Sequence, residues 1–274
     1  NPDHLWASQT FTITVNEVND HAPVAVTESM QVDENGTATT LVGGATSLLA
    51  NDTDEDLPND TLTVNTTPVV TPSHGELNLN VDGTFSYTHD GSENFTDTFS
   101  YEVRDAANHT SQVAVTISIT PVNDQAPELA AIGDQTINEQ TSLSFTVSAT
   151  DQDLPAQTLS YSLDEDSLAL GMTINAATGE FSWTPSESRG GATYPVTVTV
   201  TDNGTNPASL WANRTFAITV NEANVAPELA AIGSQTVNEH ASLSFTVSAT
   251  DQDLPAQTLS YRLDQVSLGR GMTI

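Results

Sequence analysis

The sequence contains no cysteine and no lysine, and its five basic residues are all arginines, set against 36 aspartates and glutamates. The formal net charge of the 274 residues is therefore −31. Without cysteine there can be no disulfides, zinc–thiolate sites, iron–sulfur clusters or cysteine nucleophiles. Without lysine there is no Schiff-base chemistry. Nucleic acid and anionic membrane surfaces are not expected partners, because both are bound through basic patches.

Long apolar runs and catalytic motifs are also missing from the sequence. No stretch approaches the roughly 20 apolar residues of a membrane-spanning helix, so direct membrane insertion of this segment is not expected. We find no arrangement of a nucleophile with a general base, and we therefore expect no enzymatic activity. Hydrophobic residues make up 37% of the chain, which is enough to form packed cores.

Internal repeats indicate how the chain is organised. Residues 127–174 recur as residues 227–274 with nine differences, and residues 1–17 resemble residues 206–222. Such similarity at a fixed spacing is typical of tandem arrays. We predict the last strands of one repeat (1–22), a divergent repeat (23–126), a full repeat (127–226) and the N-terminal half of another (227–274), so that the chain is a piece of a longer array.

Within the repeats, apolar residues alternate with Ser and Thr. Leu143, Phe145 and Val147 fall on one side of an expected strand, and a similar alternation runs through residues 196–201. This period of two is typical of half-buried antiparallel strands. Asp82-Gly83 and Thr178-Gly179 sit between such runs and predict hairpin turns. The sequence therefore predicts an all-β fold of tandem antiparallel β-sandwiches, with no convincing helix.

Acidic residues gather at the repeat boundaries. An Asp-x-Asp motif follows an expected strand in each repeat, and Asn-Asp-x-Ala-Pro precedes two of the repeats. Asp and Asn also fill turns for purely structural reasons, and a lone Asp-x-Asp would carry little weight. The combination favours calcium, which takes six to eight oxygen ligands, over magnesium, which demands a tight octahedron.

The ordered motifs resemble a known family. Ser148-Ala149-Thr150-Asp151-x-Asp153, Thr178-Gly179-x-Phe181 and the run that ends at Asp202-Asn203-Gly204 resemble the cadherin core motif. Val18-Asn19-Asp20-His21-Ala22-Pro23 resembles the linker between cadherin repeats. Residues 127–274 are most similar to the dystroglycan-type cadherin-like repeats of large bacterial surface adhesins, and residues 23–126 to the bacterial cadherin-like repeats of giant adhesins.

The resemblance implies one group of calcium ligands at each of the three boundaries. The first group would be Glu17, Asn19, Asp20, Asp54, Asp56 and Asp105. The second would be Glu34, Asn123, Asp124, Asp151, Asp153 and Asp202. The third would be Glu139, Glu222, Asn224, Asp251 and Asp253, with Glu187 as a weaker candidate. The third linker is one residue shorter than the others and lacks their Asp, so weaker binding or a different bend is expected there.

The resemblance also implies a function. The expected protein is a calcium-rigidified stalk segment of a secreted or surface-anchored bacterial adhesin, in contact with calcium ions, with neighbouring repeats of the same chain, and with a cell-surface protein or glycan. The alternative is a carbohydrate- or protein-binding accessory module of a secreted polysaccharide-degrading enzyme. That alternative requires aromatic side chains aligned on one sheet face, whereas aromatics form only 6% of the chain, mostly in core-like positions.

Overall fold

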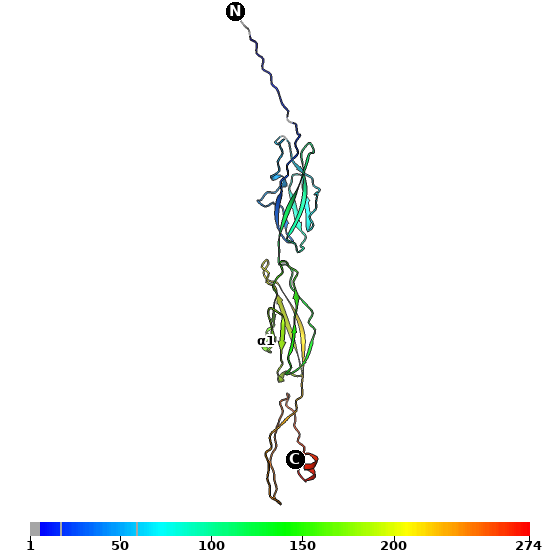
Figure 1. Ribbon diagram of the computed structural model, residues 1–274, viewed down its shortest axis with the longest axis vertical. Coiled ribbons are helices and arrows are strands. Elements are labelled where there is room, and N and C mark those ends of the chain that lie inside the picture. The colour runs from blue at the N-terminus through cyan, green and yellow to red at the C-terminus, as the bar shows by residue number, and fades with distance from the viewer. Residues whose placement is uncertain (1–5, 17, 59) are drawn as a thin grey trace, which may run out of the picture. The chain divides into compact units, whose positions relative to one another are not determined.

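The computed structural model describes residues 6–16, 18–58 and 60–274 (Figure 1). The contacts within the chain divide it into two compact units. The first unit comprises residues 1–124 together with the loop 152–156, and the second comprises residues 125–151 and 157–274. Each unit is built from antiparallel and parallel strand pairs, so the predicted all-β fold is confirmed. The boundaries of the four repeats stay a prediction.

The first unit contains two sheets. The larger sheet has the order β1 (Glu28–Asp33), β7 (Thr110–Thr120), β6 (Thr96–Arg104), β3 (Thr63–Val64), with β1 parallel to β7 and the other pairs antiparallel. The smaller sheet has the antiparallel order β2 (Thr37–Ala38), β5 (Phe85–His89), β4 (Gly75–Leu79). A 3-10 turn covers Leu48–Ala50. Alternate residues of both sheets, among them Met30, Phe99 and Tyr87, are fully buried in one core, as expected for a sandwich.

The predicted hairpin at Asp82-Gly83 joins β4 to β5. Gly83 adopts a φ of 80°, and the Thr84 N–H donates to Asp82 Oδ1 at 3.0 Å. A residue with a Cβ is disfavoured at that φ. The second predicted hairpin, at Thr178-Gly179, joins β13 (Thr173–Ile174) to β14 (Glu180–Trp183) with a φ of 70° at the glycine. Both hairpin predictions are confirmed.

The second unit contains two principal sheets and two short strand pairs. The larger sheet has the order β12 (Ser160–Leu163), β15 (Ala192–Thr201), β16 (Trp211–Asn221), β9 (Gln135–Asn138), with β9 parallel to β16. The smaller sheet has the order β10 (Leu143–Thr146), β14 (Glu180–Trp183), β13 (Thr173–Ile174). The short pairs are β8 (Glu128–Leu129) with β11 (Ala149–Thr150), and β17 (Glu228–Leu229) with β18 (Ala249–Thr250).

The core of the second unit follows the predicted alternation. Val196, Val198 and Val200 are fully buried, as are Ile218 on the neighbouring strand β16 and Phe181 on β14 of the other sheet. Burial of these β-branched and aromatic side chains supplies most of the free energy that holds the sheets together.

Two one-turn helices interrupt the strand pattern that the sequence predicts. They are α1 (Glu165–Ala169) and α2 (Gln265–Gly269). Asp164 caps α1 by accepting the Ser167 N–H, and Asp264 caps α2 in the same way. A single turn is too short to show helical periodicity, so the caps were the only available sequence signal.

A buried acid sits in the core of the first unit. The Tyr101 hydroxyl lies 2.9 Å from Glu28 Oε2, 3.1 Å from the Leu48 carbonyl oxygen and 3.4 Å from Asp52 Oδ2. A hydroxyl has one hydrogen to donate, so it cannot satisfy three acceptors. Glu28 Oε1 is buried and accepts no hydrogen bond. Burial raises the pKa of Glu28 to about 7, and the nearby Asp52 carboxylate adds to the effect.

This pKa makes the stability of the first unit depend on pH. The contribution of Glu28 is fully present below its ordinary pKa of 4.5 and is lost as the pH rises through about 7. Glu28→Gln cannot ionise, so we expect its melting temperature in chelator to exceed that of the wild type at pH 8 and to match it near pH 4.5. Glu76→Gln, at an exposed glutamate of β4, is the control and should change neither value. Equal loss of stability in wild type and Glu28→Gln between pH 5 and 8 would refute the assignment.

Candidate metal centres

Acidic side chains converge at four places in the part of the chain that the structure describes. In each group, one ligand atom of every residue lies within 4.8 Å of those of the other members. Two oxygens bound to one calcium ion at roughly 2.4 Å are at most about 4.8 Å apart, so each group meets this requirement for sharing one ion. The groups are Asp20–His21–Asp56, Asp54–Asp60–Asp105, Glu93–Asp124–Asp153 and Glu139–Glu187–Glu222.

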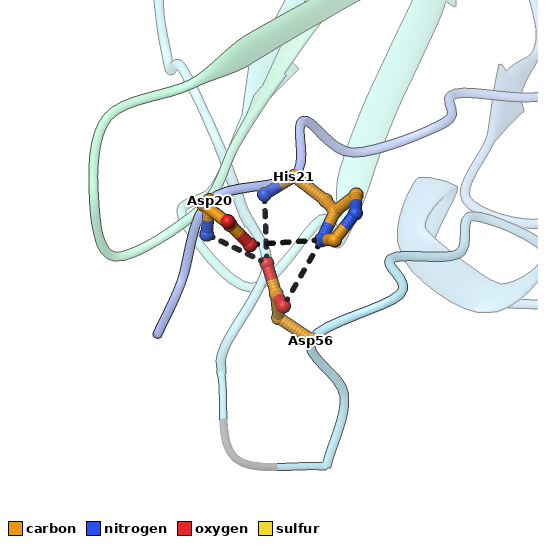
Figure 2. Close-up of side chains that lie close together, drawn as sticks. All are labelled: Asp20, His21 and Asp56. Carbon is orange, nitrogen blue, oxygen red and sulfur yellow. Dashed lines mark hydrogen bonds and ion pairs between the residues drawn. The ribbon is translucent and has the colours of Figure 1, made fainter. Parts of the chain in front are cut away.

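The first group joins the linker to the Asp-x-Asp loop (Figure 2). Asp56 Oδ2 accepts the backbone N–H of His21 at 2.9 Å and that of Asp20 at 3.1 Å. The His21 ring nitrogen Nδ1 lies 3.1 Å from Asp20 Oδ1 and 3.3 Å from Asp56 Oδ1. The backbone N–H of His21 holds the pKa of Asp56 below its usual value, and the hydrogen bond between the His21 ring and Asp56 Oδ1 raises the pKa of His21. Asp20 and His21 are exposed to solvent.

The second group is buried within the first unit. Asp54, Asp60 and Asp105 are 8%, 7% and 3% exposed. Asp54 Oδ2 and Asp60 Oδ2 are buried and accept no hydrogen bond. The His109 ring nitrogen Nδ1 lies 2.7 Å from Asp105 Oδ2, and this hydrogen bond raises the pKa of His109. Two unsatisfied, buried carboxylate oxygens are costly in the absence of a cation.

The third group brings the second linker against the loop 152–156, within the first unit. Glu93 Oε2 accepts the Leu154 N–H at 2.8 Å, and Asp124 Oδ2 accepts an amide hydrogen from Asn35 at 2.9 Å. Asp153 is 1% exposed.

The neighbouring Glu34 shares this acidic environment. It is 4% exposed, and its Oε2 accepts the Val122 N–H at 3.2 Å. Burial raises the pKa of Glu34 to about 7, and the Glu93 and Asp124 carboxylates raise it further against the effect of that hydrogen bond. A carboxyl group held in this state gains from a nearby cation, which favours its charged form.

The fourth group lies in the second unit. Both oxygens of Glu139 accept backbone N–H groups, from Gly190 and from Ala223, each at 3.1 Å. Glu222 is exposed overall, but local desolvation of its carboxyl group raises its pKa, and the Glu139 and Glu187 carboxylates add to the shift. Glu187 Oε1 also accepts the Leu254 N–H at 3.3 Å, which ties this group to the loop after β18.

The remaining predicted ligands belong to none of the four groups found among the described residues, and several of them accept hydrogen bonds from nearby backbone or side-chain groups instead. Asp202 Oδ1 accepts the N–H of Gly204 and of Leu210, and Asp253 accepts the Val225 N–H with both oxygens at 3.0 Å. Asp251 Oδ1 accepts the Asp253 N–H, and Asn224 Oδ1 accepts an amide hydrogen from Gln257. Of the others, Asn19 has a buried Oδ1 without a hydrogen-bond partner, Asn123 is buried, Asp151 lies directly after β11, and Glu17 lies outside the described residues.

The structure adds three residues that the sequence analysis did not select: His21, Asp60 and Glu93. Glu93 and Glu187 both lie shortly before a long strand, β6 or β15, and this shared position was an available signal. Asp60 follows the Asp-x-Asp motif by four residues, and only the folded loop brings it back to Asp54. His21 was not predicted as a ligand because an imidazole is not an expected calcium ligand.

The donor set fits a hard divalent cation. The second, third and fourth groups consist only of carboxylates, and the first adds the imidazole of His21. Carboxylate oxygens suit calcium, whereas sites for zinc or copper are richer in nitrogen and sulfur. The two unsatisfied oxygens of Asp54 and Asp60 are the clearest sign that a positive charge belongs there.

Comparisons with known proteins agree with this geometry. Residues 19–121 match the family model of the bacterial cadherin-like domain, and residues 126–221 match that of a putative Ig domain. The predicted resemblance to bacterial cadherin-like tandem repeats is therefore confirmed. Cadherin-like domains are typically noncatalytic adhesion modules.

Solved cadherin ectodomains share the fold. The mouse cadherin-23 fragment EC22-24 aligns with a TM-score of 0.58 at 22% identity, over 85% of this chain and 79% of that one. Human protocadherin-24 EC1-2 aligns with a TM-score of 0.55 at 21% identity, over 73% and 98% of the two chains. Drosophila N-cadherin EC1-4 aligns with a TM-score of 0.54 at 14% identity, over 73% of this chain and 49% of that one. At these identities the likeness concerns the fold alone.

A curated relative is the human FRAS1-related extracellular matrix protein 1, which is 33% identical over 136 residues. The match covers 44% of this chain but 6% of that protein. Among the described residues, no helix has the length and apolar character required to cross a membrane.

Proposed function

We propose that this chain is a calcium-binding structural segment of an extracellular adhesion protein. The observation that carries the proposal is the gathering of carboxylates into groups within 4.8 Å, with buried oxygens of Asp54 and Asp60 left unsatisfied. The cadherin-like fold and the matrix protein among the relatives support an extracellular, adhesive role. The match to the bacterial cadherin-like domain supports a bacterial surface protein as the source.

The proposed ions would act mechanically, on the linkers. Asp20 in the first linker shares a group with Asp56 of the Asp-x-Asp loop, and Asp124 in the second shares one with Asp153. One ion bound by both members of such a pair holds the linker segment against the loop. Without the ion, the carboxylates repel and the linker gains freedom. An array of such repeats would then bend less in the presence of calcium than in its absence, because each linker is held in place.

Hydrogen exchange at the second linker tests this role. We expect the amides of Val122, Asn123 and Asp124 to exchange more slowly in 10 mM calcium than in chelator, as measured by mass spectrometry. The amides of Val196 and Val198, in the core of β15, are the internal control and should not change. Linker exchange rates that are the same with and without calcium would contradict the proposed mechanical role.

A further inference from the structure

We propose that Asp60 is a calcium ligand, and that the Asp54–Asp60–Asp105 group fills with an ion before the other three groups. The inference rests on the proposed function, since it names the residue and the order of binding within the same set of sites. It concerns a side chain that neither the Asp-x-Asp motif nor the linker motif includes.

The three carboxylates are fixed in place before any ion arrives. In each of them Oδ1 accepts a backbone N–H: Asp56 donates to Asp54 at 2.9 Å, Ala106 donates to Asp60 at 3.1 Å, and His109 donates to Asp105 at 2.7 Å. The backbone thus orients each carboxylate, while Oδ2 of Asp54 and of Asp60 stays available and Asp105 Oδ2 contacts the His109 ring. A preorganised set of ligands loses little conformational entropy on binding, which favours high affinity.

The available oxygens are poorly compensated. The Oδ2 atoms of Asp54 and Asp60 are buried without any donor, and Asp105 Oδ2 has only the ring nitrogen of His109. Three carboxylates that are 3–8% exposed therefore face one imidazole, whose side chain is 41% exposed. Electrostatic attraction for an added cation is strongest where solvent screening is weakest.

The other three groups are expected to attract a cation less strongly. Asp20 is exposed and already pairs with the imidazole of His21. Asp124 in the third group and Glu222 in the fourth are exposed as well, so water solvates their charge. Both oxygens of Glu139 are satisfied by backbone N–H groups. Occupation of these groups is expected to need more calcium.

The isosteric variant Asp60→Asn tests the inference, with calcium chloride as the probe and melting temperature and equilibrium dialysis as readouts. Asn keeps the oxygen that accepts the Ala106 N–H and places an amide near the other two carboxylates. In chelator we expect the melting temperature of Asp60→Asn to exceed that of the wild type, because the substitution removes the repulsion between the carboxylate of residue 60 and those of Asp54 and Asp105. In calcium we expect its tightest binding phase to weaken at least about tenfold, the loss typical of changes around a metal site. Glu76→Gln, which removes one exposed charge from the same unit, is the control.

The possible outcomes separate this inference from the proposed function. If the wild type binds calcium and the tightest binding phase of Asp60→Asn is unchanged, the role of Asp60 is overturned and the proposed function stands. Absence of calcium binding by the wild type would overturn both. A melting temperature of Asp60→Asn below that of the wild type in chelator would also count against the inference, since it would show that the buried carboxylate is not under repulsion.

Discussion

Removal of calcium is expected to lower the melting temperature of the first unit by roughly 10–20 °C. One ion at a hundredfold excess over its dissociation constant stabilises a domain by about 2.7 kcal/mol. One kcal/mol corresponds to roughly 4–8 °C for a domain of 60–100 residues. The first unit holds the Asp54–Asp60–Asp105 group, whose buried oxygens lack donors, so it should respond strongly. Differential scanning calorimetry in 10 mM calcium and in excess EGTA measures the difference.

Magnesium provides the control for this experiment. Magnesium at equal ionic strength screens surface charge as calcium does, but it requires an octahedron of shorter bonds and retains its waters. We expect it to recover only a minor part of the stabilisation. If magnesium and calcium raised the melting temperature equally, the effect would be general screening of the −31 charge and the specific sites would be refuted.

Truncation of Phe181 is expected to destabilise the second unit by roughly 3–5 kcal/mol, the usual cost of removing a buried aromatic side chain. Phe181 is fully buried on β14. Its ring stacks on Phe145 with centroids 4.9 Å apart, and it meets the edge of Phe216 at 6.0 Å. Phe181→Ala therefore leaves a cavity between the two sheets of this unit. Urea denaturation, followed by the midpoint of the second unit, measures the loss.

Phe245→Ala is the matched control, because Phe245 belongs to the same unit and its side chain is 51% exposed. A substitution at such a position changes stability by no more than about 0.5 kcal/mol. A loss below about 1 kcal/mol for Phe181→Ala would show that the three rings do not form the structural centre of the second unit.

The local pattern of the sequence predicted the sheets because burial and strand geometry act on neighbouring residues. Alternation placed Val196, Val198 and Val200 on the inner face, and the glycines of both hairpins were visible as turn signals. Burial also depends on partners that a short segment does not carry. Tyr161 and Tyr261 stand in identical stretches of sequence, yet the first is 9% exposed and the second 41%. Tyr161 lies on β12 against β15, whereas among the described residues Tyr261 lies in no strand.

The candidate sites were predictable where the motif itself holds the ligands. Asp54, Asp56 and Asp105 were selected from sequence, and each lies in an acidic group of the first unit. Asp60 and Glu93 were not, because they reach their groups only through loop conformation. Asp202 was selected, but both of its oxygens accept N–H groups around its own turn. Whether the selected residues bind calcium stays a prediction that binding data must test.

The most direct test of the account is equilibrium dialysis of the chelator-treated chain against radioactive calcium in 0.15 M potassium chloride. At this ionic strength the general attraction of calcium to a chain of charge −31 is largely screened. The account predicts saturable uptake of more than one ion per chain, half-complete at or below about 10⁻⁴–10⁻³ M, the range of extracellular calcium modules. Uptake that rises linearly without saturation would contradict it.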